Sequence, residues 1–402
     1  MQPSFFRDNR DHLRHVTKGG LIIVSAYTAM QRGNDASFSF EQEANFWYLT
    51  GINAPDWWVI IDGKSKKSWL VAPEVDDVHQ VFDGSLSTSD AQKISGVDAV
   101  ISQDEADTLL RDLAKQHSLV YAIGDDARAE HYDFSVNPAQ KDMWLRLTRT
   151  FADVQDCRKQ LAKLRAIKQP EEVRAIKKAI KLTVDTFKNV KQSLLLLQTE
   201  YEVEAEFTYA FRKSGAVGHA YDPIVASGKN ACTLHYNQNQ QKLQKNSLLL
   251  LDIGARVDGY AADITRTFAV GTPTPRQTAV HAAVEKAHKQ IIKLLRPGLS
   301  VLEYHKTVDD IMQDALIDLG LLTSKDDTKT YRTYFPHAIS HGLGIDVHDS
   351  LGGPTEFASG MVLTVEPGIY IPEEGIGVRI EDDILITDTG HTNLSAALPT
   401  SL

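Results

Sequence analysis

The first 150 residues alternate short apolar runs with one amphipathic segment. The apolar runs have the length and composition of buried strands, and they lie at residues 21–26, 46–52, 57–62, 68–73 and 119–124. Between residues 105 and 117 the apolar positions recur instead with the spacing of a helix. This alternation predicts a small α/β domain at the N-terminus.

The pattern changes near residue 150 to a basic stretch rich in helix-forming residues. Pro170 can open a helix, and Glu171 and Glu172 stand in its first turn. Apolar side chains then recur every three or four positions, at Val173, Ile176, Ile180, Val184 and Phe187. We therefore expect a long helix with one buried face. We place the domain boundary at residue 155, which gives an N-terminal domain of residues 1–155 and a C-terminal domain of residues 156–402.

Two more helices and two groups of strands follow in the C-terminal domain. Residues 276–295 predict a helix that ends before Pro297 and Gly298. A second helix begins at Ser300, which can form a capping box with Glu303. The strand patterns are grouped at 247–270 and 361–388. Helices grouped apart from strands favour an α+β domain over alternating βαβ units.

Three histidines on these two helices fall among polar residues. They are His281, His288 and His305. We expect all three side chains to face solvent.

Two aspartates, Asp252 and Asp263, interrupt the apolar positions between residues 248 and 268. The dipeptide Asp258-Gly259 predicts a two-residue hairpin turn, which pairs Asp252 with Thr265. Asp263 then lies diagonally opposite Asp252 on the same face, with the Cβ atoms roughly 7 Å or less apart. Two like charges there repel unless one is protonated or a cation lies between them. Arg266 or another base could neutralise the pair, or both could bind metal, and the hairpin alone leaves both possibilities open.

Further candidate ligands lie downstream. The glycine-rich segment 334–353 contains His337, His341 and His348, and Glu366 and Glu381 each interrupt an apolar run. Four such carboxylates in one domain are hard to explain by ion pairing alone. Four carboxylates and one imidazole suit Mn²⁺, Co²⁺, Fe²⁺ or Zn²⁺, and two such ions would balance four negative charges. The pattern favours a binuclear metal centre.

At these residues the chain resembles the pita-bread metallopeptidases, and among them the Xaa-Pro peptidases. The segments that carry the resemblance are DIGARVDGYAADITRTF, SHGLGIDVHD, TVEPGIY and RIEDDILIT, and the N-terminal EANFWYLTGINAPD is similar to aminopeptidase P. The resemblance implies an α+β fold with a C-terminal pita-bread (creatinase/aminopeptidase-like) catalytic domain and a smaller N-terminal α/β domain.

The resemblance also implies a ligand set for two divalent metal ions. Asp252 would hold one metal, Asp263 and Glu381 would bridge the two, and His341 and Glu366 would complete the shell of the other. We take Mn²⁺ as the first choice, with Co²⁺, Zn²⁺ or Fe²⁺ as alternatives.

Roles in catalysis and substrate binding follow from the same resemblance. His235 would stabilise the tetrahedral intermediate and bind substrate, His348 would contact the scissile peptide, and His337 would line the substrate pocket. Glu366 would act as general base. Arg379 should point the same way along its strand as Glu381 and order the carboxylates, and we count it among the substrate-binding residues.

The resemblance implies hydrolysis of the Xaa-Pro bond, which releases the first residue of proline-containing peptides. An Xaa-Pro dipeptidase (prolidase) on the same site is an alternative. Such dipeptidases usually carry an arginine upstream of the glutamate at position 366 to hold the substrate carboxylate. From Thr333 to Val378 this chain has no Lys or Arg, which favours aminopeptidase P.

Three other functions fit the sequence less well. A non-catalytic peptide-binding module on the same fold would have lost ligands, and all of them are present here. Methionine aminopeptidases usually lack so large an N-terminal domain. Creatinase-like chemistry does not retain the metal set.

Charge and cysteine content restrict the partners and the compartment. Asp and Glu outnumber Lys and Arg by 53 to 43, which gives a net charge of -10 and argues against nucleic acid or an anionic membrane as a partner. Two cysteines fit a reducing compartment, and the first residues lack the apolar segment of a secretory signal. We expect a cytoplasmic protein and, from the family's habit, a homo-oligomer, either a dimer or a tetramer.

Overall fold

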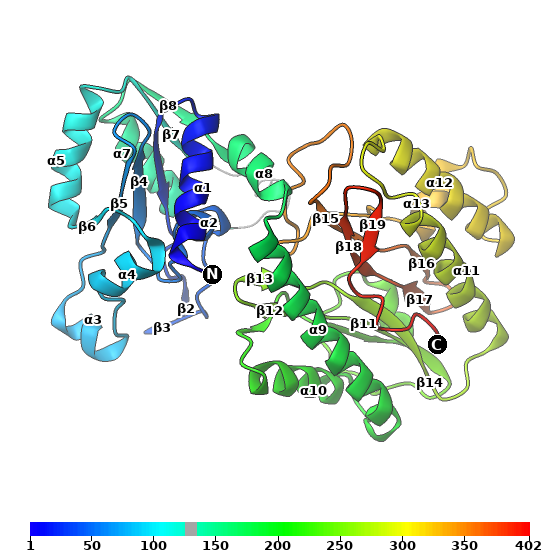
Figure 1. Cartoon of the computed structure of the whole chain (residues 1–402). Coiled ribbons are helices and arrows are strands. Elements are labelled where there is room, and N and C mark those ends of the chain that lie inside the picture. The colour runs from blue at the N-terminus through cyan, green and yellow to red at the C-terminus, as the bar shows by residue number, and fades with distance from the viewer. Residues whose placement is uncertain (125–134) are drawn as a thin grey trace. The chain divides into compact units, whose positions relative to one another are not determined.

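The computed structural model describes residues 1–124 and 135–402 (Figure 1). The chain divides into two compact units, Met1–Leu164 and Arg165–Leu402. We placed the domain boundary at residue 155, and that position stays a prediction.

The first unit contains a six-stranded mixed sheet. Its strand order is β6-β5-β4-β1-β7-β8, in which β4 pairs antiparallel with β1 and β5 and the other neighbours are parallel. All side chains of β1 and β4 are buried, so both faces of the central strands are covered. The strands are β1 (Leu21–Ser25), β4 (Trp58–Asp62), β5 (Lys67–Val71), β6 (Ala99–Ile101), β7 (Leu119–Ala122) and β8 (Asp153–Asp156), and a separate pair is β2 (Gln31–Gly33) with β3 (Ala36–Ser37).

Helices complete this unit and confirm the expected small α/β domain. The helix predicted near residue 105 forms as α5, and Ser102 and Glu105 make a capping box at its start. Among the residues that the structure describes, the helices are α1 (Pro3–Val16), α2 (Ala44–Thr50), α3 (Asp77–Phe82), α4 (Thr88–Ser95), α5 (Gln103–Ala114), α7 (Ala139–Thr148) and α8 (Arg158–Ala166), the last of which crosses the division between the units.

We grouped the run 46–52 with the strands, and this prediction is wrong because the run lies largely in helix α2. The side chain of Glu43 caps the helix by accepting from the backbone N–H of Phe46 at 2.6 Å. Gly51, with φ of 71°, ends it in the left-handed conformation. These two local signals outweigh the strand preference of the aromatic residues.

The second unit contains five α-helices among its described elements, with strands grouped between them (Figure 1). The helices are α9 (Pro170–Ser193), α10 (Glu200–Lys213), α11 (Pro275–Ile292), α12 (Val301–Asp318) and α13 (Thr328–Tyr334), with 3-10 turns η1 (Leu194–Leu196) and η2 (Gly228–Cys232). The strands are β9 (Gly218–His219), β10 (Ile224–Ser227), β11 (Ser247–Asp252), β12 (Ala255–Val257), β13 (Tyr260–Ala261), β14 (Thr265–Val270), β15 (Val362–Val365), β16 (Gly368–Ile371), β17 (Ile376–Arg379), β18 (Asp382–Ile386) and β19 (His391–Asn393).

The strands of this unit form small antiparallel sheets that pack against helices. The sheets are β10-β11-β14, β13-β12-β9, β15-β18-β19 and β16-β17. Helix α9 packs against β12 and β13, and α11 packs against β15, β16 and β17. Val284, Ile291 and Met312 from the helices meet Leu363 and Val378 from the strands in one buried cluster. The grouping of helices and strands confirms the α+β class of this unit.

Two of the three histidines expected in solvent are buried. His281 and His288 on α11 are 3% and 2% exposed, whereas His305 on α12 is exposed as expected. The prediction was wrong for the first two because they share one helical stripe with Val284 and Ile291, at spacings of three and four residues. Burial lowers the pKa of His288 to about 4, although Asp382 lies 3.4 Å from its ring.

Within residues 1–124 and 135–402, none of the helices combines the length and the hydrophobicity needed to cross a membrane. The expected cytoplasmic location stays a prediction.

Candidate active site

The hairpin predicted around Asp258 forms with the expected register. Asp258 and Gly259 have φ values of 52° and 85°, and Asp252 pairs with Thr265. The ladder is interrupted near Gly254, where a Cβ would lie 1.7 Å from the carbonyl oxygen of Ala262. Only glycine permits this close approach. The interruption separates the β11–β14 ladder from the turn and leaves Asp263 outside any strand.

The side chains of Asp252 and Asp263 converge on one hydroxyl group. The Tyr221 hydroxyl lies 2.5 Å from Asp252 Oδ1 and 2.6 Å from Asp263 Oδ1. Glu381, which follows β17, joins them, because one oxygen from each of the three carboxylates lies within 4.8 Å of the others. Thr265 holds Glu381 twice: its carbonyl oxygen accepts from the Glu381 N–H at 3.0 Å, and its hydroxyl donates to Glu381 Oε2 at 2.7 Å.

His341 and Glu366 lie beside these carboxylates. His341 Nε2 is 3.4 Å from Asp263 Oδ2 and 3.6 Å from Glu366 Oε1. His341, Glu366 and Glu381 also place one ligand atom each within 4.8 Å. The other ring nitrogen, Nδ1, lies 2.9 Å from the carbonyl oxygen of Gly342, which orients Nε2 toward the carboxylates. All five residues that we predicted as metal ligands therefore meet in one place.

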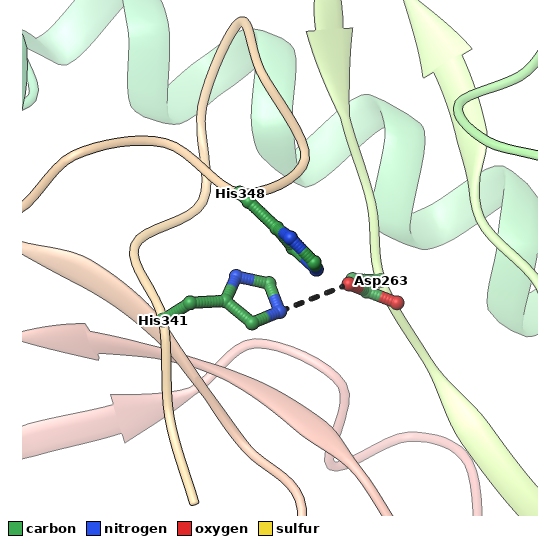
Figure 2. A group of neighbouring side chains, drawn as sticks. All are labelled: Asp263, His341 and His348. Atoms are coloured by element: carbon green, nitrogen blue, oxygen red, sulfur yellow. Dashed lines mark ion pairs between the residues drawn. The ribbon is translucent and has the colours of Figure 1, made fainter. Parts of the chain in front are cut away.

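His348 lies at the edge of the same cluster. Figure 2 shows the side chains of His341 and His348 pointing toward Asp263 from the segment between α13 and β15. The three residues can offer ligand atoms within 4.8 Å of one another, and the two imidazole rings are 4.2 Å apart. Burial, followed by the charges of His341 and His235, lowers the pKa of His348 to about 4. His348 is therefore neutral near pH 7 and can donate through one ring N–H.

The negative charge of the cluster exceeds the positive charge that the protein supplies. Burial raises the pKa of Asp263 and of Glu381, and it raises that of Glu366 to about 7. Burial alone would lower the pKa of His341, but Asp263 and Glu366 raise it to about 9. Buried carboxylates this close together protonate unless cations separate them. The donor set, oxygen-rich with one imidazole, fits divalent metal ions of the hard or borderline kind.

Arg266 does not neutralise the aspartate pair. Its guanidinium donates to Asp382 at 2.6 Å and to the carbonyl oxygens of Thr265, Glu381, Leu398 and Pro399. Arg379 instead donates to Asp252 Oδ2 at 2.6 Å. Of these two arginines, only Arg379 forms an ion pair with a carboxylate of the cluster, that of Asp252. Neither forms one with Asp263, Glu366 or Glu381.

Arg379 begins a chain of hydrogen bonds that ends at His337. It donates to the Tyr370 hydroxyl at 2.7 Å, and this hydroxyl lies 2.9 Å from His337 Nε2. His337 Nδ1 lies 2.7 Å from the carbonyl oxygen of Ala338. Burial and the charge of Arg379 lower the pKa of His337 to about 4, so the ring is neutral, donates from Nδ1 and accepts the Tyr370 proton at Nε2.

His337 also lines a cavity of about 340 Å³. The other side chains on its wall come from α12, from α13 and from the segment that follows α13, and they include His305, Asp309, Arg332 and Phe335. The pocket-lining role expected for His337 stays a prediction, and the cavity is consistent with it.

His235 follows η2 and is exposed, between the half-buried Leu234 and Tyr236. Its charge lowers the pKa of both His337 and His348, which brings it into the neighbourhood of the cluster. Its predicted role stays a prediction.

Two contributors were missed in the sequence. Tyr221 precedes Asp222-Pro223 in a loop, and nothing in its local pattern distinguishes it from a core tyrosine. Thr265 appeared only as the partner of Asp252 in the ladder. Their hydroxyl groups form hydrogen bonds with carboxylates that lie 31 to 116 positions away in the chain. No local sequence pattern indicates such contacts.

Comparisons with known proteins agree with this geometry. The model of metallopeptidase family M24 matches residues 174–388. The chain belongs to metallopeptidase family M24. The model of the aminopeptidase P N-terminal domain matches residues 6–121 of this M24 member.

Relatives of this M24 member match it over nearly its whole length. An Xaa-Pro aminopeptidase of Haemophilus influenzae is 34% identical over 94% of this chain and 90% of its own, and one of Escherichia coli is 34% identical over 98% and 94%. A solved structure described as a putative aminopeptidase P from Bacillus anthracis has a TM-score of 0.88 at 32% identity, over 100% of this chain and 96% of its own. The expected fold, with an aminopeptidase P-type N-terminal domain and an M24 domain, is confirmed.

Proposed function

We propose that this M24 member is an Xaa-Pro aminopeptidase, which hydrolyses the bond between a first residue and a proline in peptides. The observation that carries the proposal is the buried cluster of Asp252, Asp263, Glu381, His341 and Glu366, whose charge and donor atoms fit divalent metal ions. The aminopeptidase P N-terminal domain and the named relatives point to the substrate.

The five residues would hold two divalent ions, with Mn²⁺ as the first choice and Co²⁺, Zn²⁺ or Fe²⁺ as alternatives. When bound, such ions would polarise the substrate carbonyl and make water more acidic. We retain the assignment in which Asp252 serves one ion, Asp263 and Glu381 serve both, and His341 and Glu366 serve the other.

The remaining steps belong to the protein's own groups. Glu366 would accept the proton of the attacking water as the general base. His235 and His348 would donate to the oxygen that gains negative charge and to the peptide at the cleaved bond. His337, beside its cavity, would contact the substrate.

The Xaa-Pro amide needs a dedicated site because it lacks an N–H and restricts the preceding residue. A dipeptidase would also need a free cation for the substrate carboxylate. Arg379 is committed to Asp252, Tyr370 and Thr265, and the stretch from Thr333 to Val378 has no Lys or Arg. Both observations favour the aminopeptidase.

A substrate comparison tests the proposal. Protein stripped with a chelator is given Mn²⁺, Co²⁺ or Zn²⁺ and then Ala-Pro or Ala-Pro-Ala. We expect metal-dependent release of alanine from Ala-Pro-Ala. Cleavage of Ala-Pro alone would establish the dipeptidase, and peptide binding that survives the chelator without cleavage would establish a non-catalytic module. A cytoplasmic location and a dimeric or tetrameric state are part of the same proposal.

A further inference from the structure

Glu200 is a fully buried carboxylate outside the metal-ligand cluster. It occupies the first turn of α10 and is 0% exposed. Its Oε1 accepts hydrogen bonds from the N–H of Ser227 and the side chain of Asn230, both at 2.9 Å. Its Oε2 accepts from the Tyr236 hydroxyl at 2.8 Å and the Gln241 N–H at 2.9 Å. Four donors fill the lone pairs of an acceptor-only, ionised carboxylate.

All four donors lie in residues 227–241, here called the anchored segment, and this segment carries His235. The Glu200 N–H also donates to the Gln241 carbonyl oxygen at 2.9 Å, so Glu200 fixes the end of the segment through both backbone and side chain. Burial, and then the bond to Glu200, raise the pKa of Tyr236 to about 12, which keeps its hydroxyl a donor. Tyr236 is the residue directly after His235.

The anchored segment also contacts β17, the strand that carries Arg379. A Cβ at Gly377 of β17 would lie 2.3 Å from the Ala231 carbonyl oxygen, so the two backbones touch. The Cys232 thiol donates to the Ile376 carbonyl oxygen at 3.4 Å. The segment is thus held both by Glu200 and by β17, and His235 lies in the part of it beyond η2.

We propose that Glu200 is a positioning residue that fixes His235 for its work on the tetrahedral intermediate. This inference rests on the proposed function. If Glu200 only stabilised the fold, the effect of its substitution on kcat would not depend on His235. Substitutions of residues that act as one unit have non-additive effects on kcat, so a double-mutant cycle separates the two cases.

The test uses metal-loaded protein with Ala-Pro-Ala as substrate and four variants: Glu200→Gln, His235→Ala, the double variant, and Glu206→Gln as the matched control on the exposed side of α10. Glutamine presents an NH₂ group to two of the four donors. We expect E200Q to lower kcat by about 10-fold or more while the bound metal is unchanged. In the His235→Ala background the same change should lower kcat by less than about 2-fold. E206Q should match the wild type.

A second measurement is independent of turnover. The imidazole NMR signal that disappears in His235→Ala should shift or broaden in E200Q and stay in place in E206Q. If E200Q does not fold, Tyr236→Phe removes one donor from the anchor and should repeat the pattern with a smaller, about 2- to 5-fold loss of kcat.

Three results would overturn the proposal: equal fold-losses from E200Q in both backgrounds, an unchanged His235 signal in E200Q, or full turnover in E200Q. Failure of the proposed function has a different signature. In that case the wild type itself does not cleave Ala-Pro-Ala, or His235→Ala retains wild-type turnover.

Discussion

Arg379 and Asp252 lie 127 residues apart in the chain and meet at 2.6 Å inside the cluster of predicted metal ligands. Arg379 also donates to Tyr370 and Thr265, so one buried guanidinium sets the orientation of a predicted ligand and of the hydroxyl that reaches His337. Side chains that orient ligands in this way tune metal affinity as well as geometry.

Replacing Arg379 by lysine tests this relationship. Lysine keeps the charge but cannot bind Asp252, Tyr370 and Thr265 together, because it lacks the planar fork of donors. We expect R379K to weaken metal affinity by about 10- to 100-fold, measured by titration of stripped protein with Mn²⁺. Arg276→Lys, at a surface ion pair with Glu374, should leave the affinity unchanged. Equal affinities for R379K and wild type would contradict the orienting role.

Substitutions of Asp263 and of His235 should differ in their effects on metal binding and on turnover. Asp263→Ala removes a carboxylate shared by two of the ligand groupings, so metal and activity should be lost together. His235→Ala should keep the metal and lower kcat by about 100- to 1,000-fold. Metal content by elemental analysis and turnover of Ala-Pro-Ala give the two readings. Asp258→Asn, in the exposed hairpin turn, serves as control, and a stripped wild type with full activity would defeat the metal assignment.

We expect the Tyr221 hydroxyl to contribute most to the stability of the fold when metal is absent. It is the shared hydrogen-bond partner of Asp252 and Asp263, and burial, with these two carboxylates, raises the pKa of Tyr221 so that it keeps its proton. Tyr221→Phe leaves the carboxylates without that partner, at a cost of about 1–3 kcal/mol in the stripped protein. Thermal unfolding should show a larger drop in Tm without metal than with it, because bound cations would take over the stabilisation. A drop of the same size with and without metal would refute this, and Tyr334→Phe is the surface control.

Glu172, which is not among the proposed ligands, should make the stability of the fold depend on pH. Burial raises its pKa to about 6 from 4.5, although the Gln169 N–H and the Tyr260 hydroxyl both donate to it. Because the folded-state pKa is raised, its stabilising contribution is full below pH 4.5 and is lost as the pH rises through 6. The loss amounts to about 2 kcal/mol.

Unfolding of Glu172→Gln across pH 4 to 8 measures this contribution. The stability of E172Q relative to wild type should increase between pH 4.5 and about 6 and then level off. Glu171→Gln is the neighbouring control, since the helix N-terminus and Arg174 lower the pKa of Glu171 and its trend should run the opposite way. A pH-independent difference between E172Q and wild type would argue that Glu172 titrates normally.

Local rules explain which parts of the fold were predictable. Pro170 begins α9 as expected, and the Asp258-Gly259 turn imposes the register that pairs Asp252 with Thr265. Both depend on backbone preferences within a few residues. The run 46–52 failed by the same logic, because the Glu43 cap and Gly51 were stronger local signals than the aromatic composition.

The sequence alone determined which side chains are candidate metal ligands, through their chemistry and the family resemblance, and it determined the pairing around Asp252, because turn geometry is a local property. Only the tertiary structure decided that Tyr221 bridges two carboxylates, that Glu200 holds the segment around His235, and that His281 and His288 are buried. These relations join segments distant in the chain, and they arise when packing brings separate helices and strands together, which no periodicity along the chain encodes.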